Sequence, residues 1–158
     1  MIALDTNILV YAHRADSIHH TAAQELLSSL AEGDEPWGIP WPCVYEFLRV
    51  VTHPRIFDPP TDLTDALEDT VSLLESSSIR MLGEGPNHIM HLVRMADAGN
   101  ARGNLIHDAH IAALALENGV TELWTVDRDF ARFTGLRVRN PFSEPAVHES
   151  GRRYMAGR

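Results

Sequence analysis

Lysine is absent from this chain of 158 residues, and all 13 positively charged side chains are arginine. The chain therefore cannot form a lysine Schiff base, and it cannot contain the lysine of a P-loop nucleotide-binding site. Cysteine is nearly absent as well, because Cys43 is the single one. No disulfide can close within the chain, which fits a reducing compartment better than an oxidising one.

Long hydrophobic runs are also missing. The longest apolar stretches cover residues 8–12 and 111–116, whereas a helix that crosses a bilayer needs about 20 apolar residues. No basic segment precedes an apolar one at the start of the chain, so no secretory signal is expected. We therefore expect a cytoplasmic protein with no membrane partner.

An excess of positive charge is lacking too, since the formal net charge is −9. This excludes a protein that simply coats nucleic acid, because such proteins are basic. It does not exclude an enzyme that acts on nucleic acid, because a cluster of carboxylates that binds a metal ion would itself make the total negative. The hydrophobic content of 44% is typical of one globular domain with a buried core.

Short apolar segments alternate with longer segments of helical periodicity. The short segments predict strands at 1–4, 37–41, 79–82 and 121–126, and an edge strand at 137–140. This alternation predicts a three-layer α/β/α fold whose central sheet is mostly parallel and covered by helices on both faces. We expect one domain over residues 1–142, followed by a polar tail over 143–158.

The side chains that should fill the core follow from the same patterns. A helix predicted over 63–77 carries an apolar stripe that we expect to be buried; it consists of Leu63, Ala66, Leu67, Val71 and Leu74. Trp37, Trp41 and Trp124 lie in or beside predicted strands, so we expect core positions for all three.

Acidic residues follow the predicted strands. Asp5 comes directly after the first strand and Asp127 after the fourth, while Glu46 lies in the first turns of the helix after the second strand. Ligands of parallel sheets gather at the carboxyl ends of strands, so these three should approach one another. Asp108 is a charged residue early in a strongly apolar helix. Taken singly, Asp5 fits a helix cap, Asp108 a first-turn carboxylate and Glu46 a solvated surface position.

Taken together, these four carboxylates indicate a metal site. Two carboxylates about 4 Å apart repel each other by roughly 4 kcal/mol at an effective dielectric constant near 20. A divalent ion such as Mg²⁺ relieves that repulsion, because it prefers oxygen ligands. Such an ion activates water and shields the charge that develops on a phosphate. The chemistry that fits is hydrolysis of a phosphodiester bond, with one or two ions.

The motifs that carry these residues resemble a known family. "LDTNILVYA" near the start, Glu46 in "YEF", Asp108 in "HDAHIAALA" and "TVDRDF" at 125–130 are similar to PIN-domain ribonucleases, and most of all to VapC-type toxins. The resemblance covers residues 1–142 in the expected order. It implies that Asp5, Glu46, Asp108 and Asp127 form a catalytic quartet that binds Mg²⁺ or Mn²⁺, with Asp5 and Asp108 as the best-supported ligands.

The same resemblance implies further roles. Asn7 and Thr125 match polar positions that support the carboxylates by hydrogen bonds, and Asp129 either supplements the site or caps the helix before Phe130. The family likeness also implies an endoribonuclease with an RNA substrate, a small antitoxin that blocks the pocket, and a homodimer.

Arginines near the predicted pocket are candidates for contacts with RNA phosphates. Arg14 follows the first helix, Arg102 precedes the helix of Asp108, and Arg128 lies between two aspartates. Guanidinium groups bind phosphate through paired hydrogen bonds and would offset the negative charge of the pocket. Solvated surface positions are the alternative for each of them.

Nine histidines raise the alternative of a zinc site. His88 and His91 are three residues apart, as are His107 and His110, but the zinc-binding pattern HExxH is absent. We therefore expect structural or solvent-facing roles, with His107 and His110 as possible neighbours of the substrate.

Three other functions fit parts of the pattern. A haloacid-dehalogenase-like phosphatase would need a second aspartate where Asn7 stands, and generally a lysine. A response-regulator receiver also relies on a lysine. A catalytically silent PIN-like binding module would not need the complete acidic quartet.

Overall fold

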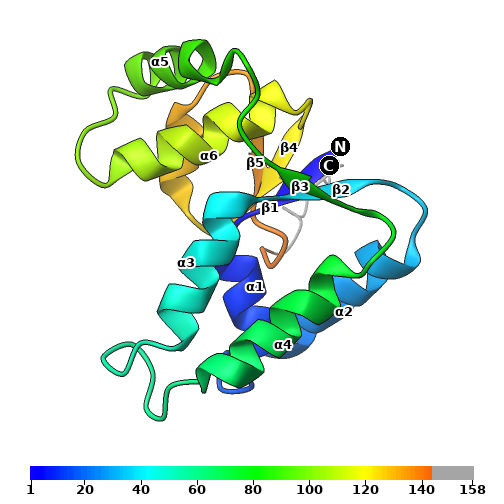
Figure 1. Ribbon diagram of the computed structural model, residues 1–158. Coiled ribbons are helices and arrows are strands. Elements are labelled where there is room, and N and C mark those ends of the chain that lie inside the picture. The colour runs from blue at the N-terminus through cyan, green and yellow to red at the C-terminus, as the bar shows by residue number, and fades with distance from the viewer. Residues whose placement is uncertain (144–158) are drawn as a thin grey trace, which may run out of the picture.

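The computed structural model describes residues 1–143 (Figure 1). Apart from Ser143, the predicted polar tail at 143–158 lies outside the described residues. None of the helices within residues 1–143 is both long enough and apolar enough to span a membrane.

Five short strands form one sheet in which all neighbours run parallel. They are β1 (Ile2–Leu4), β2 (Trp37–Pro40), β3 (Ile79–Leu82), β4 (Glu122–Trp124) and β5 (Arg137–Arg139). Their order across the sheet is β3-β2-β1-β4-β5. β1 lies in the middle, where Ile2 is in register with Trp37 of β2 on one side and Glu122 of β4 on the other. The five predicted strands are thus confirmed, with β5 at an edge.

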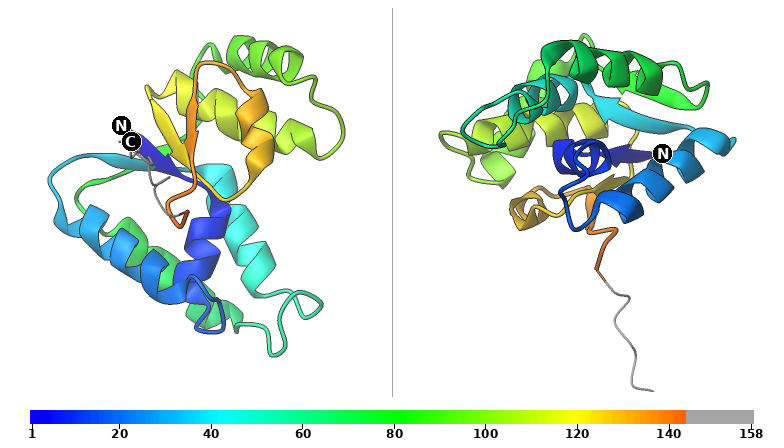
Figure 2. Two further views of the ribbon diagram at one scale, coloured as in Figure 1. Left: turned by 180° about the vertical axis from the view of Figure 1, so that it is seen from behind. Right: turned by 90° about the horizontal axis from the view of Figure 1, so that it is seen from below.

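Helices cover the sheet on two sides. They are α1 (Thr6–His13), α2 (His20–Glu32), α3 (Trp41–Val51), α4 (Leu63–Leu74), α5 (His88–Ala98) and α6 (Leu105–Glu117), together with the 3₁₀ helix η1 (Arg128–Arg132). Figure 1 shows α5 and α6 together above the sheet and α1, α2 and α4 below it; Figure 2 shows the same arrangement from behind. This confirms the predicted three-layer α/β/α fold.

The core forms where the central strands meet α1, α3 and α6. Ala3 and Leu4 of β1 and Ile39 of β2 are fully buried, as expected for strands covered on both faces. α6 contributes a run of five buried residues, Ile111 to Ala115, which explains why its sequence is apolar on nearly every side.

The strand order creates a switch point beside β1. The chain winds from β1 outward to β2 and β3, then crosses back to β4 and β5 on the other side. In open parallel sheets, ligands bind in the crevice at such a point, outside the carboxyl ends of the strands. Asp5 follows β1 and Asp127 follows β4 at this crevice.

Two predictions about burial are wrong. On α4, Leu63, Leu67 and Val71 are 59%, 43% and 58% exposed, and only Ala66 of the predicted stripe is fully buried. The side of α4 that faces the core instead carries Ala66, Leu73 and Leu74, which pack against it. Trp41 is 37% exposed because it begins α3 instead of ending β2, and its ring stacks on Tyr45, which is also exposed.

Candidate active site

A pocket of about 660 Å³ opens at the switch point of the sheet. All four carboxylates of the predicted quartet line it, and they come from four different elements or element ends: Asp5, Glu46, Asp108 and Asp127. Asn7, Arg49, Asn104 and His107 are among the other lining residues. The parallel sheet and the start of α6 therefore bring together acidic residues that are up to about 120 positions apart in sequence.

Asp5 is the most deeply buried acidic residue of the pocket, with 5% of its surface exposed. It caps α1, since its Oδ1 accepts a hydrogen bond of 2.7 Å from the backbone N–H of Thr6. The thiol of buried Cys43 donates to the same oxygen at 3.6 Å. The cap and the pocket wall are thus two roles of one side chain, and neither excludes the other.

The hydroxyl of Thr125 connects three groups around the pocket. It donates to Asp5 Oδ2 at 2.7 Å and accepts from Asn7 Nδ2 at 2.9 Å and from the backbone N–H of Asp127 at 3.0 Å. One donor and two acceptor positions are the full capacity of a hydroxyl. Thr125 is 1% exposed, so it holds the ends of β1 and β4 at a defined separation without competition from solvent.

Asn7 completes this network from α1. Its Nδ2 donates to Asp5 Oδ2 at 3.0 Å as well as to Thr125, and its Oδ1 accepts from the backbone N–H of Val126 at 3.3 Å. Asn7 and Thr125 therefore both hold the Asp5 carboxylate in one orientation.

Asp108, Asp127 and Asp129 form the tightest acidic cluster of the pocket region. One carboxylate oxygen from each lies within 4.8 Å of the others. Asp127 caps η1 by accepting a 2.8 Å hydrogen bond from the backbone N–H of Asp129. The alternative prediction that Asp129 is the cap is wrong, because Asp129 lies inside the first turn and its side chain reaches back toward Asp127.

Burial and mutual repulsion change the acidity of this cluster. Burial raises the pKa of Asp5 above its usual value, against the opposing effect of its hydrogen-bond donors. The pKa of Asp108 is raised to about 6, first by burial and then by the charges of Asp127, Asp5 and Asp129. These carboxylates lie close together, and every ligand atom that they offer is an oxygen. Both properties fit a hard divalent ion such as Mg²⁺ or Mn²⁺.

Glu46 lies on the α3 side of the pocket and is paired with Arg49 one turn later. Arg49 donates two hydrogen bonds to the Glu46 carboxylate, at 3.0 and 2.5 Å. This pairing lowers the pKa of Glu46. Both side chains are about half exposed, so the pair is accessible from the open side of the pocket.

The three arginines expected to contact substrate do not line the pocket. Arg14 is engaged by Asp16 and lies over the Phe57 ring in an adjacent hollow, while Arg102 bonds Asn100. Arg128 is exposed on η1. Arg49 lines the pocket instead, and its position three residues after Glu46 on one helix was the available signal.

The two histidine side chains of α6 point to different sides of the helix. His107 lines the acidic pocket beside Asp108. His110 turns away from it and bonds Glu84 at 3.0 Å through Nε2. Of this pair, only His107 is therefore placed to meet a substrate in the acidic pocket.

Comparison with known proteins identifies the chain's relatives. The family model described as PIN domain matches residues 2–136. Ribonuclease VapC43 of Mycobacterium tuberculosis is 45% identical over 141 residues, which cover 89% of this chain and 95% of the relative.

Two solved structures show the same fold at lower sequence identity. The sarcin-ricin loop cleaving toxin VapC20 of Mycobacterium tuberculosis superposes with a TM-score of 0.61 at 15% identity, covering 87% of this chain and 99% of that one. A toxin–antitoxin complex from Klebsiella pneumoniae contains a chain with a TM-score of 0.60 at 17% identity, covering 91% and 100%.

Proposed function

The chain belongs to the PIN domain family, and we propose that it is an endoribonuclease of the VapC type, the toxin of a toxin–antitoxin pair. One observation carries the proposal: four carboxylates from separate elements line one pocket at the switch point of the sheet. The relatives named as ribonucleases span nearly the whole chain, so the likeness includes all the elements that build this pocket.

We propose that Asp5, Asp108 and Asp127 hold a divalent cation, Mg²⁺ or Mn²⁺, with Asp129 close enough to supplement them. Supporting this, one carboxylate oxygen each from Asp108, Asp127 and Asp129 lies within 4.8 Å of the other two, and Asp5 lines the same pocket. The pKa of Asp108 is raised first by burial and then by the neighbouring charges. When bound, such an ion supplies positive charge opposite the phosphate and makes water more acidic.

The remaining residues of the pocket act through position and charge. Thr125 and Asn7 both donate to Asp5 Oδ2 and so hold its carboxylate in one orientation at the pocket wall. Arg49 is the cation of the pocket wall and binds Glu46 when no RNA is present. An RNA phosphate would compete for this guanidinium, which frees Glu46 to accept a proton from the attacking water.

The reaction proposed is hydrolysis by in-line attack of water on phosphorus, with departure of the ribose oxygen. Glu46 orients that water, and the buried Asp5 supplies negative charge that would hold the cation opposite the phosphate. His107 lies at the rim beside Asp108, where it can contact the RNA strand.

Two partners complete the proposal: a small antitoxin and a second copy of the chain. Two separate faces carry exposed apolar side chains, namely Leu63, Leu67 and Val71 on α4, and Ile89, Met90 and Val93 on α5. Exposed apolar patches of this kind are typical of interaction surfaces. Light scattering of the protein alone and with its antitoxin should give a dimer and a larger complex; a monomer at micromolar concentration would contradict the homodimer.

Purified protein incubated with total cellular RNA tests the activity. Cleavage at mapped sites should require Mg²⁺ or Mn²⁺ and should stop when EDTA is added. Cleavage that continues in EDTA, or no cleavage with either ion, would contradict the proposed function.

A further inference from the structure

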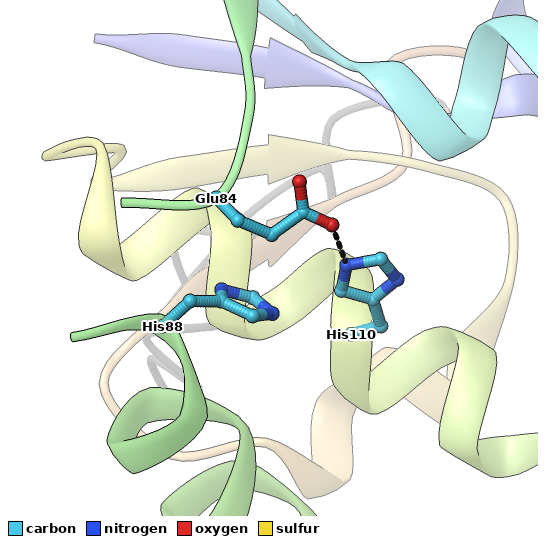
Figure 3. Close-up of side chains that lie close together, drawn as sticks. All are labelled: Glu84, His88 and His110. Carbon is cyan, nitrogen blue, oxygen red and sulfur yellow. Dashed lines mark hydrogen bonds and ion pairs between the residues drawn. The ribbon is translucent and has the colours of Figure 1, made fainter. Parts of the chain in front are cut away.

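A second group of possible metal ligands lies apart from the acidic pocket, between α5 and α6. Glu84 from the loop after β3, His88 from the start of α5 and His110 from α6 each place one ligand atom within 4.8 Å of the others. Figure 3 shows the His88 ring directed toward His110, with the Glu84 carboxylate reaching the same space. Three segments of the chain therefore converge on one point.

The His88 ring carries the clearest sign of a missing ligand. Its Nε2 is the one buried side-chain nitrogen or oxygen within residues 1–143 that has no hydrogen-bond partner. A buried polar atom without a partner is destabilising, so it calls for an explanation such as an ion. The His88 and His110 ring centroids are 5.1 Å apart. The outer edge of the His88 ring is directed toward His110 (Figure 3).

Glu117 determines which His88 nitrogen is free to bind an ion. Its Oε2 lies 2.8 Å from His88 Nδ1, and the side chains of both residues are largely buried. A carboxylate acceptor places the proton of a neutral imidazole on Nδ1, which leaves the Nε2 lone pair directed into the group. Histidines that bind metal ions are commonly oriented in this way, by a carboxylate on the other ring nitrogen.

The loop before α5 is fitted to the same arrangement. The backbone N–H of Gly85 donates to Glu117 Oε1 at 3.0 Å, so both Glu117 oxygens are occupied. A Cβ at position 85 would lie 2.5 Å from Oε1, so a larger residue there would displace the Glu117 carboxylate from its present position. The loop that carries Glu84 is thereby held next to His88.

We propose that Glu84, His88 and His110 bind a divalent cation of the zinc class, with water as a fourth ligand. Two imidazole nitrogens and one carboxylate oxygen form a donor set that suits Zn²⁺ and not Mg²⁺. Without the ion, His110 shares a proton with Glu84 across their 3.0 Å contact. A bound ion would take the place of that proton between His110 and Glu84. It would thereby connect α5, α6 and the loop after β3.

Binding of Co²⁺, a spectroscopic substitute for Zn²⁺, tests the site without reference to RNA cleavage. Tetrahedral Co²⁺ with nitrogen ligands absorbs visible light strongly, whereas octahedral Co²⁺ among carboxylates and water absorbs weakly. Metal-free protein titrated with Co²⁺ should develop strong visible bands that saturate at one equivalent. Weak bands only, at any ratio, would overturn the proposal.

Matched variants locate the ion. His88→Gln and His110→Gln should lose the bands, while His91→Gln, one turn along α5, and Asp108→Asn in the acidic pocket should keep them. Bands that persist in His88→Gln and vanish in Asp108→Asn would place the ion in the acidic pocket and overturn the proposal. Glu117→Gln should weaken Co²⁺ affinity about 10–100-fold, the usual effect of losing an orienting partner; unchanged affinity would contradict its role.

Two measurements on the unsubstituted protein test the site even if the variants fail to fold. Zn²⁺ at about 100 times its dissociation constant should raise Tm by about 5 °C or more. Side-chain nitrogen NMR should show Zn²⁺ moving the Nε2 signals of His88 and His110 and leaving those of His91 in place. Unmoved His88 and His110 signals would refute the site, and intact ribonuclease activity in that same sample would show that the failure concerns this site alone.

Discussion

The two faces of α6 differ in the chemistry they carry. Asp108 on one face joins an all-oxygen group of carboxylates in a pocket at the switch point of the sheet. His110, two residues later, turns to the other side and joins one carboxylate and one histidine near α5. In each group, three ligand atoms lie within 4.8 Å of one another. The two groups therefore have similar spacing and differ in which atoms they offer.

If both proposed sites bind their ions, one short helix contributes ligands to two different cations. A group of carboxylates that offers only oxygen donors suits Mg²⁺ or Mn²⁺. Burial first, and then the neighbouring negative charges, raise the pKa of Asp108. Imidazole donors suit zinc-like ions, and that group contains one carboxylate, Glu84, where the acidic cluster contains three. The first arrangement suits work on a phosphate, whereas the second suits the joining of neighbouring elements.

Removing a carboxylate from the acidic pocket should have the largest effect. Asp5→Asn and Asp108→Asn should each lower the rate of RNA cleavage by more than about 100-fold, because losing a ligand exceeds the 10–100-fold effect of losing its support. The measurement is cleavage of a mapped RNA by equal amounts of folded protein. Asp97→Asn, an exposed carboxylate at the end of α5, is the matched control and should keep full activity. Equal cleavage rates for Asp108→Asn and Asp97→Asn would show that the acidic pocket has no special role in cleavage.

Removing the support of the pocket should have the next largest effect. Thr125→Val deletes a hydroxyl that bonds Asp5, Asn7 and Asp127, so cleavage should fall about 10–100-fold. The free energy of unfolding should fall by about 1–3 kcal/mol. Thr52→Val, which removes a hydroxyl bonded only to the Leu48 carbonyl, should leave cleavage unchanged. Similar activity losses in both variants would indicate a general effect on folding.

The raised pKa of Asp108 predicts a pH-dependent stability of the metal-free protein. Asp108 binds its proton more tightly when folded, so its contribution to stability is present below about pH 4 and is lost as pH rises to about 6. A shift of this size corresponds to about 3 kcal/mol, and screening at a half-exposed site reduces it to about 1–2 kcal/mol.

Chemical denaturation between pH 4 and 7 in EDTA measures this effect. Asp108→Asn should lack this part of the pH dependence, and Mg²⁺ should restore the stability of the unsubstituted protein above pH 6. Identical pH profiles for the two proteins would show that folding does not raise the pKa of Asp108.

The smallest effect is expected from the arginines. Arg49→Gln should weaken RNA binding about fivefold, equivalent to about 1 kcal/mol for one exposed charged contact. Arg102→Gln should change it by less than about twofold, because Arg102 does not line the pocket. Binding can be measured without cleavage in an Asp108→Asn background. A larger loss of RNA binding in Arg102→Gln than in Arg49→Gln would show that Arg102, and not Arg49, contacts the RNA.

The sequence predicts this fold well because the strands of a parallel sheet are short, apolar and separated by helical segments. The ends of β1 and β4 are marked by Asp5 and Asp127, so their meeting follows from topology alone. The burial of α4 was mispredicted because periodicity reports an apolar face and not what covers it. Leu63, Leu67 and Val71 satisfy the pattern and still face outward.

Contacts that depend on the rotation of a helix or the path of a loop could not be predicted. His88 pairs with His110, not with His91, because the loop of Glu84 brings α5 against α6. Arg49 reaches the pocket because one turn of α3 separates it from Glu46, whereas Arg14 is held away by Asp16. Spacing along the chain therefore predicts which residues pair on one helix. It does not predict which side chains from different helices and loops meet at one site.

The position of Mn²⁺ in crystals of the protein, found from its anomalous scattering, tests the proposed active site with no reliance on activity. A peak among the carboxylates of Asp5, Asp108 and Asp127 is the predicted result. An empty acidic pocket in crystals grown with saturating Mn²⁺, with those side chains too far apart to share an ion, would contradict it.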